Sequence, residues 1–392
     1  MSPMTETNSA EDHRRARHPF GGREGLKVII APDSFKGSIA ARDVASAIAE
    51  GWRSIRPTDD VVVLPQADGG EGTLDAIEAA VPGSVRHEVG PVTGPDGRPT
   101  PGCWLELPGR VAVVELAQMC GLPLMRQLDP LGATTVGLGE VVRAALDAGM
   151  ERLVIGLGGS ASTDGAAGAL AALGLDGGSR PEDGSLTAGG GRIGRLATVD
   201  RSRLIAPPPG GVVLLTDVAA PLLGPLGAAA VFGPQKGATA ADIVTLDAAL
   251  AHFVTLLGGD PSIPGTGAAG GAAYGFVAAW GATIEPGADF LAGLTGLPAA
   301  VAEADVVLTG EGRFDATSGT GKVVGELIRL AGRHRAAVGV VAGQLAERPV
   351  SSAGAPLWSA ALVDLAGSVE AAMADPARWL RAAGAAAADA LG

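Results

Sequence analysis

The most informative residues of this chain are its lysines. Only four of the 29 basic residues are lysine, and three of them, Lys36, Lys236 and Lys322, lie next to a glycine. A lysine at a glycine-rich loop is a common phosphate-binding arrangement, because the backbone N–H groups can approach the ligand closely and the ammonium supplies a point charge. A solvated surface lysine in a turn is the alternative for any one of them. Together the three predict that the chain binds phosphate.

Carboxylates form a second group of candidates, because they lie at the ends of predicted strands, most of them in glycine-rich segments. They are Asp68 and Glu71 in segment 67–73, Asp164 in segment 156–165, Asp217 in segment 215–218, and Glu311 and Asp315 in segment 309–315. For a lone carboxylate, a helix cap is sufficient explanation. Several carboxylates beside phosphates repel them unless a divalent cation bridges the two, so the combination predicts phosphoryl transfer with Mg²⁺.

The familiar nucleotide-binding motifs are absent. In the segment ending Gly321-Lys322, Ala316 stands where the P-loop has its first glycine and Val323 where it has Ser or Thr. The strands are not followed by G-x-G-x-x-G, and the protein-kinase signatures are missing. A kinase with this sequence therefore belongs to another fold.

The elements that must position these residues follow from hydrophobic periodicity. Short β-branched runs such as Lys27–Ile30 alternate with helical patterns such as the apolar face of residues 39–55, which predicts an α/β fold with a mostly parallel sheet. Residues 85–116 instead contain short extended runs separated by Pro- and Gly-rich turns, which predicts antiparallel strands and a second domain of mixed type. Residues 1–25 are polar and are predicted to be a disordered extension.

Composition narrows the function classes further. The net charge of −13 disfavours nucleic acid as a partner. Two cysteines cannot form a disulfide framework or a four-thiolate metal site, which favours the reducing cytoplasm. Neither a signal peptide nor an uninterrupted apolar run of 18 residues is found, so membrane insertion is not expected.

In these motifs the chain resembles the type 1 glycerate kinases. The resemblance runs from about Lys27 to about Gly343, and its blocks, in order, are segments 31–36, 67–73, 156–165, 232–238, 267–271 and 309–315. It implies phosphorylation of D-glycerate by ATP, giving 2-phosphoglycerate. It also implies two α/β domains with the active site in the cleft between them: a Rossmann-like parallel-sheet domain (26–85 plus 288–392), interrupted by a second, mixed domain (86–287).

Roles can then be assigned to particular residues. We expect Asp164, and after it Asp68, to accept or orient the hydroxyl proton, and Lys236 to stabilise the transferred phosphoryl group. The expected substrate- and nucleotide-binding residues are Asp33, Ser34, Lys36, Gly69, Gly70, Glu71, Thr73, Gly158, Gly159, Ser160, Arg313 and Lys322. The expected metal ligands are Asp217, Glu311 and Asp315, each of which could instead cap a helix or form an ion pair.

Three segments depart from the family pattern. Ala220 replaces a usual Asn, Ser162-Thr163 replaces Thr-Asn, and Thr317 replaces Gln. These changes affect the prediction of the substrate more than the prediction of the reaction class. Two alternatives therefore remain: a kinase of another small hydroxy acid, and a non-catalytic regulator that binds a phosphometabolite. The sequence leaves the oligomeric state open.

Overall fold

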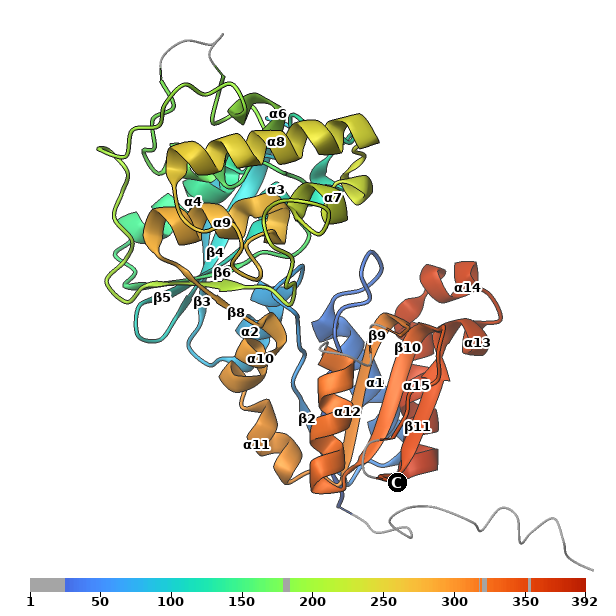
Figure 1. Ribbon diagram of the computed structural model, residues 1–392. Coiled ribbons are helices and arrows are strands. Elements are labelled where there is room, and N and C mark those ends of the chain that lie inside the picture. Colours follow the sequence, from blue (N-terminus) through green and yellow to red (C-terminus); the bar gives the residue numbers. More distant parts are fainter. Residues whose placement is uncertain (1–24, 179–183, 317, 319–322, 352–353) are drawn as a thin grey trace, which may run out of the picture. The chain divides into compact units, whose positions relative to one another are not determined.

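The computed structural model describes residues 25–178, 184–316, 318, 323–351 and 354–392 (Figure 1). The chain divides into two compact units. We call residues 1–65 with 296–392 the terminal unit, and residues 66–295 the central unit. The predicted disordered extension, apart from Gly25, lies outside the described residues, as do Lys322 and Thr317.

The terminal unit contains an all-parallel sheet of five strands in the order β11-β10-β9-β1-β2. The strands are β1 (Lys27–Ile30), β2 (Asp60–Val63), β9 (Val306–Phe314), β10 (Ala337–Leu345) and β11 (Leu357–Ala361). From β1 the chain builds first to one side, with β2, and later to the other, with β9. The strand order therefore reverses between β1 and β9, which is where open parallel sheets bind their ligands.

Helices cover both faces of this sheet. They are α1 (Ala41–Ile55), α11 (Leu297–Ala302), α12 (Val323–His334), α13 (Leu362–Ala366), α14 (Val369–Ala374) and α15 (Pro376–Leu391). Helices α1 and α15 share one hydrophobic cluster with alternate residues of β1 and β9, whereas α12 packs on β9 and β10 from the opposite face (Figure 1). The predicted Rossmann-like parallel sheet is thereby confirmed.

The central unit contains a mixed sheet of six strands in the order β3-β4-β5-β6-β7-β8. The strands are β3 (Val85–Thr93), β4 (Pro99–Leu107), β5 (Val111–Glu115), β6 (Arg152–Gly156), β7 (Val212–Leu215) and β8 (Thr283–Glu285). Strands β3, β4 and β5 pair antiparallel, and the remaining pairs are parallel. The antiparallel strands predicted within residues 85–116 are therefore confirmed.

The two faces of the central sheet bury alternate residues, as the two-residue period of a strand requires. Ile155 and Leu214 face the larger cluster, and Val154 and Leu215 face the smaller one. The larger cluster is covered by α3 (Leu116–Cys120), α4 (Val136–Asp147), α5 (Ala167–Ala172), α6 (Gly190–Ile193), α7 (Ala228–Phe232), α8 (Ala240–Leu257) and α9 (Ala268–Trp280). The smaller is covered by α2 (Thr73–Ala80) and α10 (Gly287–Leu294), and the short 3₁₀ helices are η1 (Leu122–Leu124) and η3 (Pro234–Lys236).

Both unit boundaries differ from the predicted domain boundaries. Residues 66–85 were expected in the Rossmann-like domain, but Leu74 and Ile77 of α2 are buried against the central sheet. Leu291 of α10 is buried in the same cluster, so the second boundary falls at residue 295 rather than 287. The boundaries differ because both helices bury their apolar faces on strands of the central sheet that lie far from them in the chain.

Helix α8 is, among the described residues, the one helix long and apolar enough to cross a membrane, with a mean hydropathy of 1.6. In the structure one face of α8 is packed into the larger cluster through Leu250, Phe253 and Leu257. The helix starts at a capping box in which Thr239 and Asp242 exchange hydrogen bonds. These features are those of a helix that covers the larger cluster with one face and leaves the other exposed.

Candidate active site

Four loops meet at the carboxyl ends of β6, β7 and β8 in the central unit. The Gly158 amide donates to Gly69 O at 3.0 Å, and the Thr216 amide donates to Glu285 O at 3.1 Å. A Cβ added at Gly158 would lie 2.4 Å from the Gly70 Cα, so only glycine permits this approach. The predicted segments 67–73, 156–165 and 215–218 are therefore brought together.

A carboxylate that the sequence did not single out holds the first of these loops. Glu115, at the end of β5, is fully buried and accepts hydrogen bonds from the amides of Gly72 (3.1 Å) and Leu74 (3.0 Å). These amides begin α2, beside Gly69, Gly70, Glu71 and Thr73, which were expected to bind substrate or nucleotide. Because the Gly72 and Leu74 amides already donate to Glu115, these two donors are not available to a phosphate.

The other predicted residues of this loop have different surroundings. Thr73 is buried and its hydroxyl donates to Gly70 O at 2.7 Å, so it shapes the turn. Gly69 has a φ of +87° and packs on Leu215, which makes it a conformational requirement of the loop. Glu71 is exposed.

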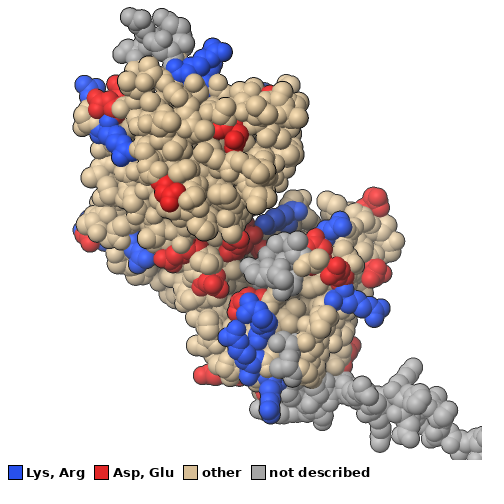
Figure 2. Space-filling model, viewed as in Figure 1, with Lys and Arg blue, Asp and Glu red and all other residues tan. Residues whose placement is uncertain are grey.

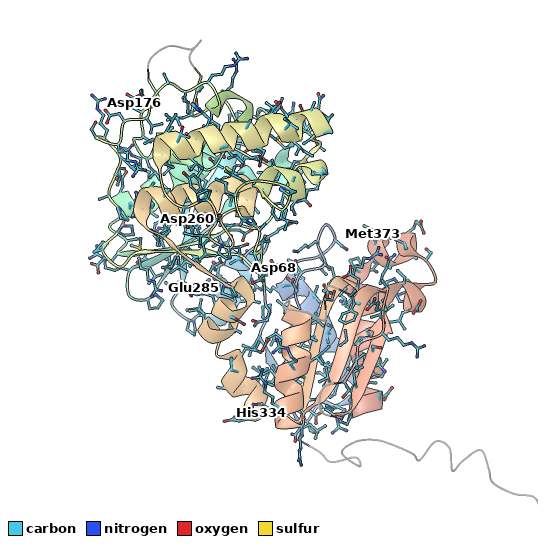
Figure 3. All side chains as sticks on the ribbon, in the orientation of Figure 1. Asp68, Asp176, Asp260, Glu285, His334 and Met373 are labelled. Carbon is cyan, nitrogen blue, oxygen red and sulfur yellow. The ribbon has the colours of Figure 1, made fainter. Side chains whose placement is uncertain are left out.

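Asp68 and Asp217 form the acidic part of the site. The Gly70 amide donates to Asp68 Oδ1 at 3.1 Å, and the Gly287 amide donates to Asp217 Oδ1 at 2.9 Å. Desolvation, and after it the charge of Asp68, raises the pKa of Asp217 to about 6, and Asp289 acts in the same direction. Acidic side chains gather over α2 and α10 in Figure 2, and Figure 3 shows Asp68 at this end of the unit, opposite Asp176.

Asp164, the first choice for the catalytic base, lies elsewhere. It is fully buried, and its Oδ2 accepts from the amide (2.9 Å) and hydroxyl (2.8 Å) of Thr135 and from the Gly168 amide (3.3 Å). Burial raises its pKa, against the effect of these hydrogen bonds. Because a carboxylate enclosed in this way has no access to a substrate hydroxyl, the structure does not support the predicted role of Asp164.

Lys236 is also buried, on the 3₁₀ helix η3. Its ammonium donates to Ser160 Oγ at 2.9 Å and to Ser162 O. Burial lowers the pKa of Lys236 to about 7, and the charge of Asp164 partly opposes this shift. The side chain therefore fixes loop 156–165 from within, and direct contact with a phosphate would need this loop to open.

Ser160 is fixed by Lys236 and by backbone contacts of its loop with residues 121–122. It is nine-tenths buried and forms a bridge with Gly121, while Gly159 O accepts from the Leu122 amide at 2.9 Å. The hydroxyls of Ser162 and Thr163, two positions that depart from the family pattern, are buried and have no partner among the described residues. Ala220 also departs from the family pattern. It has no polar side chain, and its carbonyl accepts a hydrogen bond from the Gly267 amide.

In the terminal unit, the predicted residues lie where the strand order reverses. The Asp33 amide donates to Gly310 O at 2.8 Å, which ties the loop after β1 to β9. Ser34 is buried, and its hydroxyl has no partner among the residues described. Lys36 is exposed at the tip of the loop, beside Gly37 with its φ of +75°. This exposure fits the prediction that Lys36 binds an anion.

The predicted metal ligands are divided between the units. Asp217 lies in the central unit, whereas Glu311 and Asp315 lie in the terminal unit. Arg313 forms a long ion pair with Asp315, with Nε 4.0 Å from Oδ2. Within the described part of the chain, no three His, Cys, Asp or Glu side chains are arranged to hold a metal ion. A single site made of three carboxylates is therefore not supported within either unit.

Both cysteines are buried thiols. Burial raises the pKa of Cys120 to about 12 and also raises the pKa of Cys103. A thiol of this kind is a poor nucleophile, because reaction requires the thiolate.

Comparisons with known proteins agree with this architecture. Residues 28–391 match the family model described as the glycerate kinase family. The chain is 43% identical to a glycerate kinase of Bacillus subtilis over 76% of this chain and 79% of the relative, and 38% identical to a glycerate 2-kinase of Escherichia coli over 82% and 86%. It also superposes on a crystal structure from Salmonella typhimurium LT2, described as a glycerate kinase 2, with a TM-score of 0.76 and 35% identity over 93% of this chain and 98% of the other.

The fold and these likenesses together define a kinase, an enzyme with an α/β fold in two units. More specifically, the chain belongs to the glycerate kinase family.

Proposed function

We propose that this enzyme transfers the terminal phosphoryl group of ATP to a hydroxyl of D-glycerate with Mg²⁺ present, giving 2-phosphoglycerate. The observation that carries the proposal is the pair of carboxylates Asp68 and Asp217, held by backbone amides where β6, β7 and β8 end. The names of the relatives from Bacillus subtilis and Escherichia coli support glycerate as the acceptor, and the name of the second supports its 2-position. We place the reaction in the cytoplasm.

Asp68 is the proposed base. It is half-buried and held by the Gly70 amide, whereas Asp164 is enclosed, so of these two carboxylates Asp68 is the one that combines a fixed orientation with access to a substrate. A carboxylate that accepts or orients the hydroxyl proton typically contributes a factor of roughly 10² to 10⁴ to the rate. Glu115 acts at a distance, because it fixes the amides at Gly72 and Leu74 and with them the loop that carries Asp68.

The acidic group fits a divalent cation. Desolvation and, after it, the charges of Asp68 and Asp289 raise the pKa of Asp217, and a bound cation would neutralise those charges. Carboxylate oxygens are the ligands that Mg²⁺ prefers. Asp217 and Asp289 would hold the ion, which when bound neutralises charge on the phosphates. Exposed Lys36 and Arg313 in the terminal unit are proposed to bind phosphate.

The second candidate is a kinase of a related small hydroxy acid. Ala220 favours it, since this position lacks the side-chain amide that the family usually has there. The alternative of a non-catalytic regulator is set aside, because the family is one of kinases.

A substrate panel tests the proposal. The purified chain is incubated with ATP and Mg²⁺ and, in turn, D-glycerate, L-glycerate, glycolate, D-lactate and a four-carbon sugar acid. Product is followed by ³¹P NMR, which separates the 2-phosphate from the 3-phosphate. We expect D-glycerate to give the highest kcat/KM and 2-phosphoglycerate to form. Preference for another acid would overturn the assignment of the substrate, and no ADP release with any acid would overturn the proposed reaction.

A further inference from the structure

A cavity of about 300 Å³ opens at the carboxyl ends of β9, β10 and β11 in the terminal unit. Its walls are Arg313 from β9, residues 344–346 at the end of β10, Ala361 at the end of β11, and Val363 and Asp364 from α13. The register of the sheet explains how these residues meet, because Gln344 pairs with Arg313 and Ala342 pairs with Ala361.

We propose that this cavity binds the nucleoside of the phosphoryl donor, with the base and ribose of ATP inside it. The inference rests on the proposed function and adds to it the place of the nucleotide. Open parallel sheets bind ligands beyond the carboxyl ends of their strands, near the point where strand order reverses. In this sheet that point lies between β1 and β9, and β9 forms one wall of the cavity.

The candidate phosphate loop reaches the same strand. A Cβ added at Gly312 would lie 3.3 Å from the Cα of Phe35 and 3.5 Å from the amide nitrogen of Lys36, so the loop after β1 rests directly on β9. Gly312 is followed immediately by Arg313 in the cavity wall. A nucleotide with its nucleoside in the cavity would therefore direct its phosphates past Arg313 toward Lys36.

The lining has the chemistry that a nucleoside requires. Leu345 and Val363, with two alanines, provide an apolar surface for a planar base. The amide of Gln344 offers both donors and an acceptor, which is what the edge of adenine pairs with. The carboxylate of Asp364 can accept from ribose hydroxyls, as acidic residues do in other nucleotide-binding α/β sheets.

Size also favours a nucleoside over the acceptor acid. Small-molecule sites range from about 300 to 1,000 Å³, and this cavity lies at the lower end of that range. A three-carbon acid would fill only a small part of it and would leave the apolar wall without a partner.

The first test blocks the cavity. Ala346 is exposed at its mouth, so Ala346→Trp should fill the cavity without disturbing the core. The matched control is Ala374→Trp, at an exposed position that ends α14 outside the cavity. Calorimetric titration with a non-hydrolysable ATP analogue and Mg²⁺, without acceptor, is expected to show a Kd at least about tenfold higher for Ala346→Trp and unchanged for the control. An unchanged Kd in a folded Ala346→Trp protein would overturn the proposal.

The second test addresses the ribose. The unmodified enzyme should bind ATP more tightly than 2′-deoxy-ATP or 3′-deoxy-ATP, and Asp364→Ala should weaken ATP binding by about tenfold and remove that preference. Asp389→Ala, on the exposed face of α15, is the control and should keep it. A preference that survives Asp364→Ala contradicts the assignment.

The two proposals fail separately. If the unmodified enzyme phosphorylates no acid but Ala346→Trp still raises the Kd for the nucleotide at least about tenfold, the proposed function is wrong and the nucleoside site stands. If glycerate is phosphorylated and both cavity variants bind ATP normally, the nucleoside site is wrong and the proposed function stands.

Discussion

Asp164 accepts two hydrogen bonds from Thr135, one from its amide at 2.9 Å and one from its hydroxyl at 2.8 Å. Thr135 is the N-cap of α4, and its hydroxyl in turn accepts from the Ala169 amide in α5 at 3.0 Å. The pair therefore joins the beginnings of two helices in the interior of the central unit. This relationship makes Asp164 a structural residue and moves the search for the base to Asp68.

Asp164→Asn should mainly lower the free energy of unfolding and should have a smaller effect on kcat. The amide would place two N–H donors in a buried position where Oδ1 has no partner among the described residues. Leaving buried donors unsatisfied costs roughly 1–3 kcal/mol in the free energy of unfolding. Calorimetry gives the Tm, and kcat is measured on the folded fraction, with Asp147→Asn on the exposed part of α4 as control. A kcat lowered by 10² or more at unchanged Tm would return the role of base to Asp164.

Asp68→Asn should show the opposite pattern. Since the amide keeps the size of the side chain and can still accept from Gly70 but has no basicity, kcat should fall by roughly 10² to 10⁴ with little change in Tm. Asp217→Asn should instead raise the Mg²⁺ concentration needed for half-maximal rate. Steady-state kinetics at several Mg²⁺ concentrations distinguishes the two. Equal effects of both variants on kcat and on Mg²⁺ dependence would contradict the separate roles.

Lys236 should make stability depend on pH. Its pKa is lowered to about 7 in the folded chain by burial, whereas in the unfolded chain it has the ordinary value of 10.5. Between these values the unfolded chain binds one proton more, so the contribution of Lys236 to the free energy of unfolding rises with pH, by at most about 1.4 kcal/mol per pH unit. Denaturant titrations from pH 6.5 to 9.5 should show this rise in the unmodified chain and its absence in Lys236→Met. Parallel pH profiles for the two proteins would show that burial does not shift this group.

Glu115→Gln should affect both stability and turnover. The variant keeps one acceptor oxygen where Glu115 uses two, so either the Gly72 or the Leu74 amide loses its partner, at a cost of roughly 1–3 kcal/mol. Because these amides hold the loop of Asp68, kcat should fall while KM for ATP stays unchanged. Glu88→Gln, at an exposed position on β3, is the control. A variant with reduced Tm but normal kcat would limit Glu115 to capping α2.

The cysteines should be dispensable for turnover. Replacing Cys103 by Ser and Cys120 by Ala removes thiols that burial keeps protonated, so kcat should remain near that of the unmodified enzyme. Activity assays of the folded double variant test this. Loss of turnover with an unchanged circular dichroism spectrum would assign a cysteine to the reaction.

The sequence by itself determined those features that depend on residues close together in the chain. Strand β1 and helix α1 follow from a short apolar run and a helical apolar face, and the antiparallel strands follow from runs separated by Pro and Gly. The glycine–carboxylate loops were recognisable because each comes directly after a strand. The class of chemistry could also be predicted, because it depends on which residue types occur in those loops.

Only the tertiary structure decided which carboxylate is enclosed and which can reach a substrate. Asp68 and Asp164 lie in similar glycine-rich segments, but Thr135, 29 residues away in the chain, encloses one of them. Glu115 was missed because its partners at Gly72 and Leu74 lie more than 40 residues away, and the sequence around it resembles the end of an ordinary strand. Burial and hydrogen-bond partners are set by segments that meet only when the chain folds, so local patterns cannot specify them.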